Sequence, residues 1–376
     1  MRRICYVTGT RADFGLMAST LRQAARAPGL TVSLCVTGMH LLPEYGETVR
    51  EIEASGLAIS ARIPVLLNGS TGGVMARAIA GELLGMVDAF ERDRPDLVVV
   101  LGDRGEMLAG ALAAIHLNIP IVHIHGGERS GTVDEPVRHA ISKLAHYHFV
   151  ATEHSRQRLI SMGEWPEHIF VTGAPGLDGL AEMAQGDRSM LVAKFDLDPS
   201  RPIALLVFHP VLQEWQAAGR QVKAVLDGVI ASGCQALCLM PNSDAGGSLV
   251  RASLEAFAAT SGIRLVDHLP RDQYLSWLTA CDVMVGNSSS GIIEAASFGL
   301  PVVNVGSRQD GRERSGNIMD VPPEATAVRD AVSAALAHGR HTTNNVYGDG
   351  RAGERMVRLF QGLPLTPDLL KKTNVY

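Results

Sequence analysis

The stretch Cys281-Asp282-Val283-Met284-Val285-Gly286-Asn287-Ser288-Ser289-Ser290-Gly291-Ile292-Ile293-Glu294 decides the fold of this chain. Its opening apolar run predicts a buried strand, and the apolar spacing from Ile292 predicts a helix that ends at Phe298. A strand that turns through Gly, Asn and three Ser into a helix leaves backbone N–H groups unpaired at the positive end of the helix dipole. Hydroxyl groups stand beside these donors, so the stretch predicts a nucleotide diphosphate site, with Glu294 within reach of the ribose. The alternative is an ordinary helix N-cap with surplus serines.

The same alternation of strand and helix runs along the whole chain. Apolar runs predict strands at residues 4–8, 31–36, 97–101, 120–124, 148–151, 169–171, 203–208, 236–239, 264–266, 283–285 and 302–305. Helical spacing is found at residues 18–27, 75–90, 107–117, 136–145, 216–230, 249–259, 274–280, 292–298 and 352–361. Such alternation predicts parallel sheets with helices on both faces. We therefore expect an α/β fold of two Rossmann-like domains that face each other across a cleft.

The length of 376 residues exceeds the size at which one core usually stops growing, which favours two domains. Between Ala181 and Pro202 the pattern dissolves into the polar stretch 185–188 and then the polar, proline-bearing stretch 196–202, without a strand signal, so this region predicts the linker. We expect an N-terminal Rossmann-like domain at residues 1–182 and a C-terminal Rossmann-like, nucleotide-binding domain at 203–350. The last segment, 351–376, holds a helix that we expect to pack back on the first domain. Ligands of such sheets bind at the carboxyl ends of the strands, so the default site is the cleft.

The composition argues against several classes of partner. The chain has 34 basic and 39 acidic residues and no basic block, so nucleic acid is not expected. No apolar stretch reaches the ~20 residues that span a bilayer, and no signal peptide is recognisable, which predicts a cytoplasmic protein with no membrane partner. The five cysteines lack C-x-x-C spacing and lie mostly in strand-like runs. They predict buried free thiols rather than disulfides or a zinc site.

Polar residues gather at the strand ends of the first domain. Arg11 follows the first strand and lies beside a helix N-terminus, where it would clamp a phosphate or carboxylate. Asp103 follows the strand 97–101 and is placed like a catalytic or ribose-binding carboxylate. The alternatives are a plain surface arginine and an N-cap aspartate.

Two histidines at another strand end share a face, because His123 and His125 alternate along the predicted strand. Gly126, Gly127 and Glu128 follow them, and Asp134 comes six residues later. An H-x-H pair can bind metal, but no further ligands stand at a metal-site spacing. We therefore predict imidazoles hydrogen-bonded to carboxylates and no metal.

The second domain has candidates of the same kind. His209 ends its first strand, before a proline, and would project into the cleft as an acid or base. The segments that contain Asn242 and His268 follow the next two strands and are candidates to contact the base or ribose, with simple turns as the alternative. Arg308 belongs to a glycine-bordered arginine loop, residues 306–317, which would face the phosphate site or be only a charged surface loop.

Taken in order, these segments resemble the UDP-N-acetylglucosamine 2-epimerase family. The likeness is strongest to its hydrolysing branch, which makes N-acetylmannosamine or related sugars for sialic-acid-like nonulosonates, legionaminic acid among them. The motifs are TGTRADFG, LGDRGEML, HIHGGERSGTVDEPVRHAISKLAHYHF, FHPV, PNSDAG, GNSSSGIIEAASFGLPVVN and GSRQDGRE, which stand in the family's order and spacing over nearly the whole chain. The resemblance implies a GT-B arrangement of two Rossmann-like domains, a UDP-sugar in the cleft and no cofactor. We also expect a homo-oligomer, a dimer or a tetramer.

The resemblance also assigns roles to single residues. Those that match UDP-contacting residues of the family are Arg11, Asn242, Ser288, Ser289, Glu294 and Arg308, with the main chain near His268 and Leu269 at the uracil. Those that match residues implicated in the chemistry are Asp103, Asp134 and His209. To these we add Arg104 as a substrate-binding residue and Glu128 and His125 as catalytic candidates.

One departure from the family concerns His125. Relatives that act on UDP-N-acetylglucosamine often have a glutamate at this position, and an imidazole differs from a carboxylate by about two units in unperturbed pKa. Either the catalytic roles or the sugar therefore differ, and Glu128 is the acid placed to take over. We therefore predict that the preferred substrate is a nucleotide-linked 2,4-diacetamido-2,4,6-trideoxyglucose, as in the hydrolysing relatives on the legionaminic acid route, with UDP-N-acetylglucosamine as the alternative.

The implied reaction eliminates UDP to form a glycal and then adds water, releasing the free 2-epimer. A carboxylate among Asp103, Asp134 and Glu128 would take the C2 proton, while Ser288, Ser289 and Arg308 would stabilise the leaving diphosphate. Three alternatives remain open, namely a GT-B glycosyltransferase, a non-catalytic nucleotide-sugar sensor and a metal-dependent hydrolase.

Overall fold

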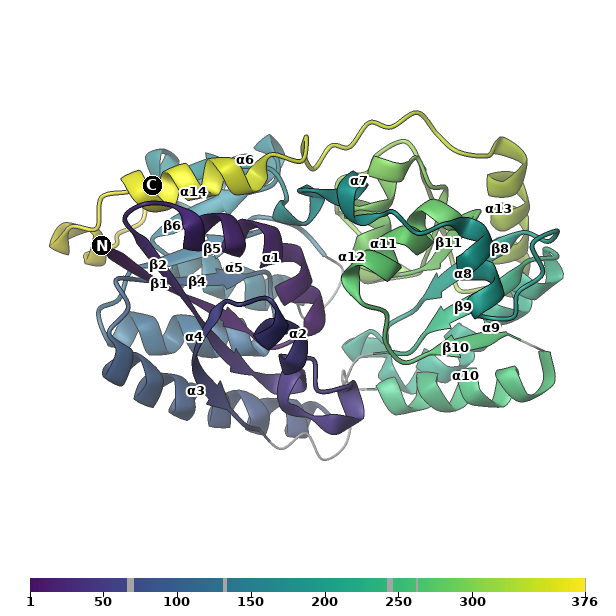
Figure 1. Ribbon diagram of the computed structural model, residues 1–376, viewed down its shortest axis with the longest axis horizontal. Helices are drawn as coiled ribbons and strands as arrows, with labels where there is room; N and C mark the ends of the chain where they lie inside the picture. The colour runs from purple at the N-terminus through teal and green to yellow at the C-terminus, as the bar shows by residue number, and fades with distance from the viewer. Residues whose placement is uncertain (66–70, 131–133, 242–245, 262, 376) are drawn as a thin grey trace.

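Two parallel β-sheets organise the computed structural model, which describes residues 1–65, 71–130, 134–241, 246–261 and 263–375 (Figure 1). The first sheet consists of β1 (Arg2–Thr8), β2 (Leu30–Thr37), β3 (Ala58–Ile63), β4 (Leu97–Leu101), β5 (Ile121–Ile124), β6 (Tyr147–Val150) and β7 (Ile169–Val171). The second consists of β8 (Ile203–Val207), β9 (Gln235–Leu239), β10 (Arg264–Val266), β11 (Val283–Gly286), β12 (Val302–Val305) and β13 (Ile318–Val321). The predicted two-domain α/β fold is confirmed.

Both sheets share the same strand order. It is β3-β2-β1-β4-β5-β6-β7 in the first and β10-β9-β8-β11-β12-β13 in the second. In each, the order reverses between the first and fourth strands, and ligands of such sheets bind outside the carboxyl ends at that point. The segments after β1, β4, β8 and β11 are therefore the ones that the topology directs to a site.

Helices cover both faces of the first sheet. They are α1 (Arg11–Arg26), α2 (Val49–Ala54), α3 (Gly72–Asp93), α4 (Gly105–His116), α5 (Asp134–Leu144) and α6 (Glu153–Ser161). Alternate residues of β1 face opposite layers, so Tyr6 packs in one cluster with Met17 of α1, and Val7 packs in another with Met86 of α3. Figure 1 shows α1 on one side of this sheet and α3 and α4 on the other.

The second sheet is covered in the same way. Its helices are α7 (Leu180–Met183), α8 (Arg188–Lys194), α9 (Ala218–Ala231), α10 (Gly247–Ser261), α11 (Arg271–Ala280), α12 (Ser289–Ile293) and α13 (Ala325–His338). Leu205 of β8 packs in a cluster with Trp277 of α11, and Leu206 packs on the opposite face with Val225 of α9. Each sheet is therefore buried on both faces, which explains the continuous apolar runs of its strands.

The last helix, α14 (Ala352–Gly362), returns to the first sheet and lies beside α1 (Figure 1). Phe360 joins the same apolar cluster as Met17. Asp178 accepts hydrogen bonds from the backbone N–H groups of Ala352, at 2.9 Å, and Gly353. The carboxylate thereby caps the first turn of α14, and the two ends of the chain are joined to one core. The domain boundaries stay a prediction.

The elements differ from the sequence prediction in several places. The helices α2, α6 and α13 were not predicted. The strands β3 and β13 were not predicted, because both lie at or near a sheet edge and are mostly half-buried, which weakens their apolar signal. The predicted linker contains the helix α8. Its Arg188 donates a hydrogen bond of 2.9 Å to the carboxylate of Asp282, which holds the helix against the second sheet. The predicted helix 292–298 is broken at Glu294 into α12 and the 3-10 helix η6 (Ala295–Phe298).

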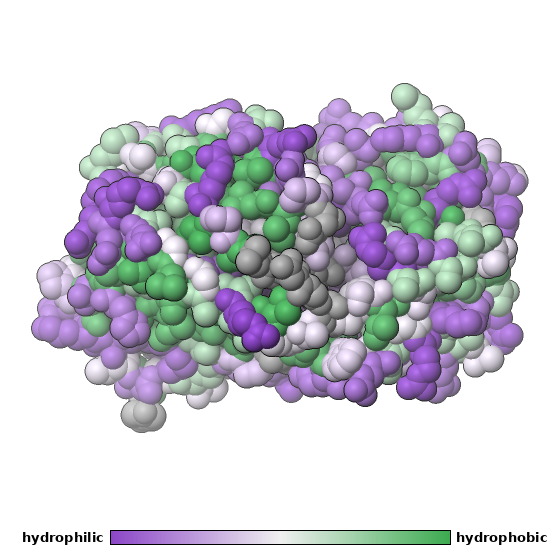
Figure 2. Space-filling model, turned by 90° about the horizontal axis from the view of Figure 1, so that it is seen from below, coloured by the Kyte–Doolittle hydropathy of each residue, from purple (hydrophilic) through white to green (hydrophobic). Residues whose placement is uncertain are grey.

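The polarity of the surface, the length and polarity of the helices and the state of the cysteines agree with what the composition predicts. Hydrophilic and hydrophobic residues are interspersed on the face shown in Figure 2. Within the described residues, every helix is too short or too polar to cross a membrane. The five cysteines are all buried and free, as predicted.

Candidate active site between the two sheets

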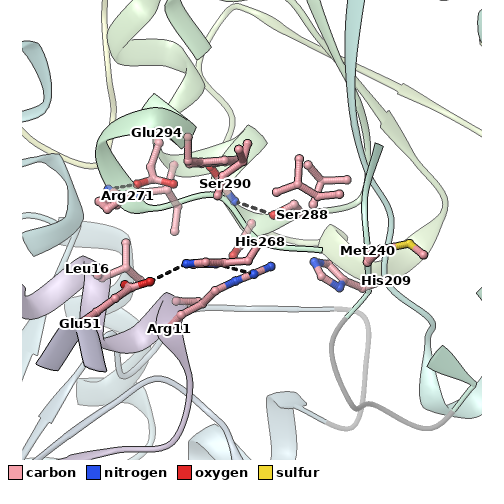
Figure 3. A pocket seen from close by; sticks show the side chains of 18 residues that line it. Arg11, Leu16, Glu51, His209, Met240, His268, Arg271, Ser288, Ser290 and Glu294 are labelled. Atoms are coloured by element: carbon pink, nitrogen blue, oxygen red, sulfur yellow. Dashed lines mark hydrogen bonds and ion pairs between the residues drawn. The ribbon is translucent and has the colours of Figure 1, made fainter. Parts of the chain in front are cut away.

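A first cavity opens between the carboxyl ends of the two sheets (Figure 3). The first sheet contributes residues of α1 and α2, and the second contributes residues that follow β8, β9, β10 and β11. The residues that line it include Arg11, Glu51, His209, His268, Arg271, Tyr274, Ser288, Ser289, Ser290 and Glu294. Six of the predicted site residues therefore meet in one cavity, and they come from both halves of the chain.

The loop after β11 has the sharp turn that its sequence predicts. Gly286 has φ +137°, and a Cβ there would lie 2.0 Å from the carbonyl oxygen of Val207, so only glycine fits. Ser288 is the N-cap of α12 and accepts from the N–H of Ser290 at 3.3 Å. Because α12 has only five residues, its dipole is smaller than predicted. An anion here would depend mainly on backbone N–H groups, hydroxyls and nearby arginines.

Asn287 connects this loop to two other candidates. Its side chain accepts from the N–H of His209 at 2.7 Å and donates to the carbonyl of His209 at 2.8 Å. Its own carbonyl accepts from Arg308 at 3.2 Å and from Gln309 at 2.8 Å. One buried amide therefore sets the positions of the histidine, the serine loop and the arginine loop relative to one another.

Glu294 lies at the junction of α12 and η6 and is buried. Its carboxylate forms an ion pair with Arg271, which also donates to the carbonyl of Gly176 at 2.9 Å. Figure 3 shows both side chains at the upper edge of the cavity. The glutamate thus lines the place where a ribose was predicted, and an internal arginine holds it there.

A chain of polar contacts crosses the mouth of the first cavity. Arg11 donates to the carbonyl of Asp267 at 3.0 Å and to Nδ1 of His268 at 2.7 Å. The other ring nitrogen of His268 contacts the carboxylate of Glu51. Figure 3 shows the imidazole between these two partners. Since Arg11 and Glu51 belong to the first sheet's helices and His268 to the second half, the contacts join the two halves directly.

A second cavity lies near the first, because Gly9 lines it and is only two residues before Arg11, the first residue of α1, which lines the first cavity. Its polar lining includes Asp103, Arg104, Glu106, Asp134 and Glu82, and its apolar lining includes Met39, Met75, Ile79, Val137 and Leu212. The buried guanidinium of Arg138 binds Asp103 and also donates to the carbonyl of Glu128 at 3.0 Å. Asp103 is thereby held in one orientation by a buried cation.

His125, Glu128 and Arg312 form a buried cluster between the two halves. Glu128 places one carboxylate oxygen on Nδ1 of His125 and the other on the guanidinium of Arg312, which comes from the arginine loop of the second half. Burial alone would raise the pKa of Glu128, but the two partners outweigh it and hold this pKa at about 2. His125 has φ +63°, a conformation that is costly for a side-chain-bearing residue and is concentrated at functional sites.

The remaining predicted residues are also accounted for. Arg104 donates to Glu106 at 2.9 Å, and Asn242 lies outside the described residues. His123 is fully buried, with its two nitrogens 2.9 Å from the Ser142 hydroxyl and 2.7 Å from the carbonyl of Gly102. The pairing of His123 and His125 assumed a strand through residue 125, whereas β5 ends at Ile124. In the part of the chain that the structure describes, no group of three His, Cys, Asp or Glu is placed to hold a metal ion.

Several functional candidates were missed by sequence reasoning. They are Glu51, Glu82, Asn287, Arg138, Arg271, Tyr274 and Arg312. Two of them could have been found from the sequence, because Asn287 lies within the turn at residues 286–290 and Arg312 lies within the arginine loop at residues 306–317. Arg138 had none, because an arginine on a helix is usually exposed.

Two Rossmann-type sheets with a phosphate-suited loop in one half and strand-end carboxylates in the other define a nucleotide-sugar enzyme of the GT-B type. The chain belongs to the UDP-N-acetylglucosamine 2-epimerase family, because the model of that family matches residues 22–361. The family predicted from the sequence is confirmed.

Particular relatives are similar over most of their length. The UDP-N,N'-diacetylbacillosamine 2-epimerase (hydrolyzing) of Legionella pneumophila is 50% identical over 376 residues, which is 100% of both chains. The GDP/UDP-N,N'-diacetylbacillosamine 2-epimerase (hydrolyzing) of Campylobacter jejuni is 32% identical over 85% of this chain and 84% of its own. The crystal structure of the UDP-GlcNAc 2-epimerase of Neisseria meningitidis, bound to UDP-GlcNAc, has a TM-score of 0.80 at 19% identity, over 95% of this chain and 98% of that one. That last likeness supports the fold.

Proposed function

We propose that the protein is a hydrolysing 2-epimerase that releases UDP and a free 2-epimerised sugar from a UDP-linked 2-acetamido sugar. The observation that carries this proposal is the pair of neighbouring cavities. One has the serine loop, Arg11 and Glu294 suited to a nucleotide diphosphate, and the other has Asp103 and Asp134 suited to proton transfer on a sugar. The family and the identity to the Legionella protein support the same activity.

Elimination explains how a weakly acidic C2 proton can be removed. The anomeric C–O bond breaks and its electron pair leaves with UDP, while the C2 proton passes to a carboxylate, so that a glycal forms. Water then gives its OH to C1, and a proton is added to C2 from the opposite face. Asp103 and Asp134 are our candidates for the C2 transfers, with His209 as an acid or base near the leaving group. Donors of the serine loop and Arg308 would stabilise the charge that develops on the diphosphate.

The contacts of Glu128 support a role other than the acid predicted from the sequence. Both of its oxygens are already engaged, by His125 and by Arg312, and its low pKa disfavours proton donation near neutral pH. We assign proton transfer to His125 and give Glu128 the task of orienting that imidazole. This arrangement would compensate for the absence of the glutamate that many relatives have at the position of His125.

A reaction through a glycal predicts solvent hydrogen at C2. With purified protein and a UDP-linked 2-acetamido sugar in deuterated water, NMR is expected to show UDP and free 2-epimer formed together, the sugar carrying deuterium at C2. Retention of the original hydrogen would exclude elimination. Product that appears only after an acceptor is added would instead indicate a glycosyltransferase.

The apolar wall of the second cavity supports a specific sugar. Met75, Ile79 and Leu212 would suit the C6 methyl and C4 acetamido groups of 2,4-diacetamido-2,4,6-trideoxyglucose better than the hydroxyls of N-acetylglucosamine. We expect kcat/KM to be about tenfold or more higher for the trideoxy sugar, measured by UDP release with both substrates at matched concentrations. A higher value for UDP-N-acetylglucosamine would refute the substrate while leaving the reaction type intact. The corresponding GDP-linked sugars complete the panel, since the Campylobacter relative is named for both nucleotides.

The cytoplasmic location and the homo-oligomeric state remain predictions. Light scattering on the purified protein distinguishes a monomer from the dimer or tetramer expected from the sequence.

A further inference from the structure

Glu82 lies in the second cavity without a role in the reaction described above. It comes from the middle of α3, and only 3% of its surface is exposed. Its neighbours along the cavity wall include Gly9, Glu106 and Asp134. A carboxyl group that is enclosed so completely beside a sugar cavity requires a partner, either within the protein or on the ligand.

The hydrogen bonds around Glu82 indicate which form it takes. Among the described residues, the carboxyl group of Glu82 has one hydrogen-bond partner, the hydroxyl of Thr37, at the long distance of 3.4 Å. That hydroxyl has a single proton, which it donates to the carbonyl of Ile63 at the much better distance of 2.8 Å. An ionised Glu82 would therefore lack a donor, whereas a protonated Glu82 needs none.

The neighbouring acids differ from Glu82 in this respect. Glu106 of α4 accepts from Arg104 at 2.9 Å. Asp13 of α1 accepts from the N–H of Thr10 at 2.7 Å and from its hydroxyl at 2.8 Å. Both acids thus have hydrogen-bond donors at short distance, although burial raises the pKa of Asp13 to about 6.

Four charged groups line the second cavity with Glu82, namely Asp103, Arg104, Glu106 and Asp134. Those that act on Glu82 are Glu106 and Arg104, both from the segment after β4. Glu106 is confined in this position, because a Cβ on Gly9 would lie 2.3 Å from its carboxylate oxygen. Burial, in the first place, and the negative charge of Glu106 raise the pKa of Glu82 to about 8, although Arg104 and Thr37 oppose the shift. At neutral pH most molecules therefore have an uncharged carboxylic acid at this point of the wall.

We propose that Glu82, in its protonated form, donates a hydrogen bond to an acetamido carbonyl oxygen of the bound sugar. This inference rests on the proposed function, because it takes the second cavity to be the sugar site. An amide carbonyl is a stronger acceptor than a hydroxyl, and the neutral acid presents a donor without an uncompensated negative charge. Glu82 would thus bind and select the substrate, and the proton transfers at C2 would stay with the other carboxylates.

The test compares Glu82→Gln, which keeps a neutral donor, with Glu82→Met, which removes it, and with Glu91→Gln, an exposed control on the same helix. For the wild type, kcat/KM is expected to fall by about tenfold in total as pH rises through 8, because the donor is lost as Glu82 ionises. In Glu82→Gln this decline should disappear, while Glu82→Met should lose about tenfold in kcat/KM at pH 7. The affinity for UDP alone should stay unchanged in all three.

A decline above pH 8 that persists in Glu82→Gln, or a Glu82→Met enzyme as active as the wild type, would overturn the proposal. Thermal unfolding provides a readout that needs no turnover. Since the folded pKa is raised above the unfolded value, the wild type loses stability relative to Glu82→Gln as pH rises from 5 to about 8, and the difference levels off beyond. If this difference appears but no nucleotide sugar is turned over, Glu82 is neutral as argued and it is the proposed function that fails.

Discussion

Replacing Asp103 with asparagine is expected to lower kcat by about 10² or more while the affinity for UDP stays within a few-fold. Asp103 lines the second cavity and is held by the buried Arg138, so the orientation of its carboxylate is fixed. An amide of the same shape preserves the geometry but cannot accept the C2 proton. The loss should therefore fall on the chemical step, which single-turnover measurements with saturating substrate report directly.

Two controls separate chemistry from folding in the Asp103→Asn experiment. Because Arg138 loses its charged partner, the unfolding midpoint is recorded alongside kcat. Asp330→Asn, an exposed position on α13, gives the effect of the same substitution far from the cavities. A kcat close to that of Asp330→Asn, or a parallel loss of UDP affinity, would remove Asp103 from the catalytic group.

Replacing Arg312 with methionine should also reduce kcat by about 10², for a different reason. Arg312 and Glu128 are buried partners from opposite halves of the chain, and removing one partner of a buried ion pair typically costs about 3–5 kcal/mol. Glu128 would lose a cation that holds its pKa at about 2, and its contact with His125 would no longer be fixed. We expect a lower unfolding midpoint together with the lower kcat.

A double variant distinguishes the structural from the catalytic part of that effect. In Arg312→Met with Glu128→Gln, no uncompensated charge remains, so the unfolding midpoint should recover in part. The value of kcat should stay low, because a neutral amide no longer orients His125 as a carboxylate does. Arg329→Met on α13 is the exposed control. Full recovery of kcat in the double variant would mean that the cluster serves stability alone.

The central strands could be predicted from the sequence with accurate bounds. The predicted ranges 97–101 and 302–305 coincide with β4 and β12, because a strand that is buried on both faces is mostly apolar. The half-buried β3 and β13 lack that signal. The turn at 286–290 was also predictable, since its glycine and serines are required by local backbone geometry.

The residues of the candidate site could be predicted only in part from the sequence. Motif order indicated the family, and the strand-end rule brought Arg11, His209 and Ser288 to one cavity. The linker prediction overlooked α8, whose short apolar run at residues 190–193 becomes a helix through its contacts with α11 and the ion pair of Arg188 with Asp282. The predicted helix through residue 298 overlooked the break at Glu294, where the carboxylate turns inward to Arg271.

The sequence by itself thus determined the alternation of strands and helices, the two parallel sheets and the loop suited to phosphate, because each follows from periodicity and turn chemistry within a few residues. Only the tertiary structure decided that Arg138 holds Asp103, that Arg312 reaches Glu128 across the cleft and that Glu82 is enclosed beside other acids. These pairings join residues far apart in the chain. Their energies depend on distance and on the exclusion of water, and both exist only after the two halves have packed together.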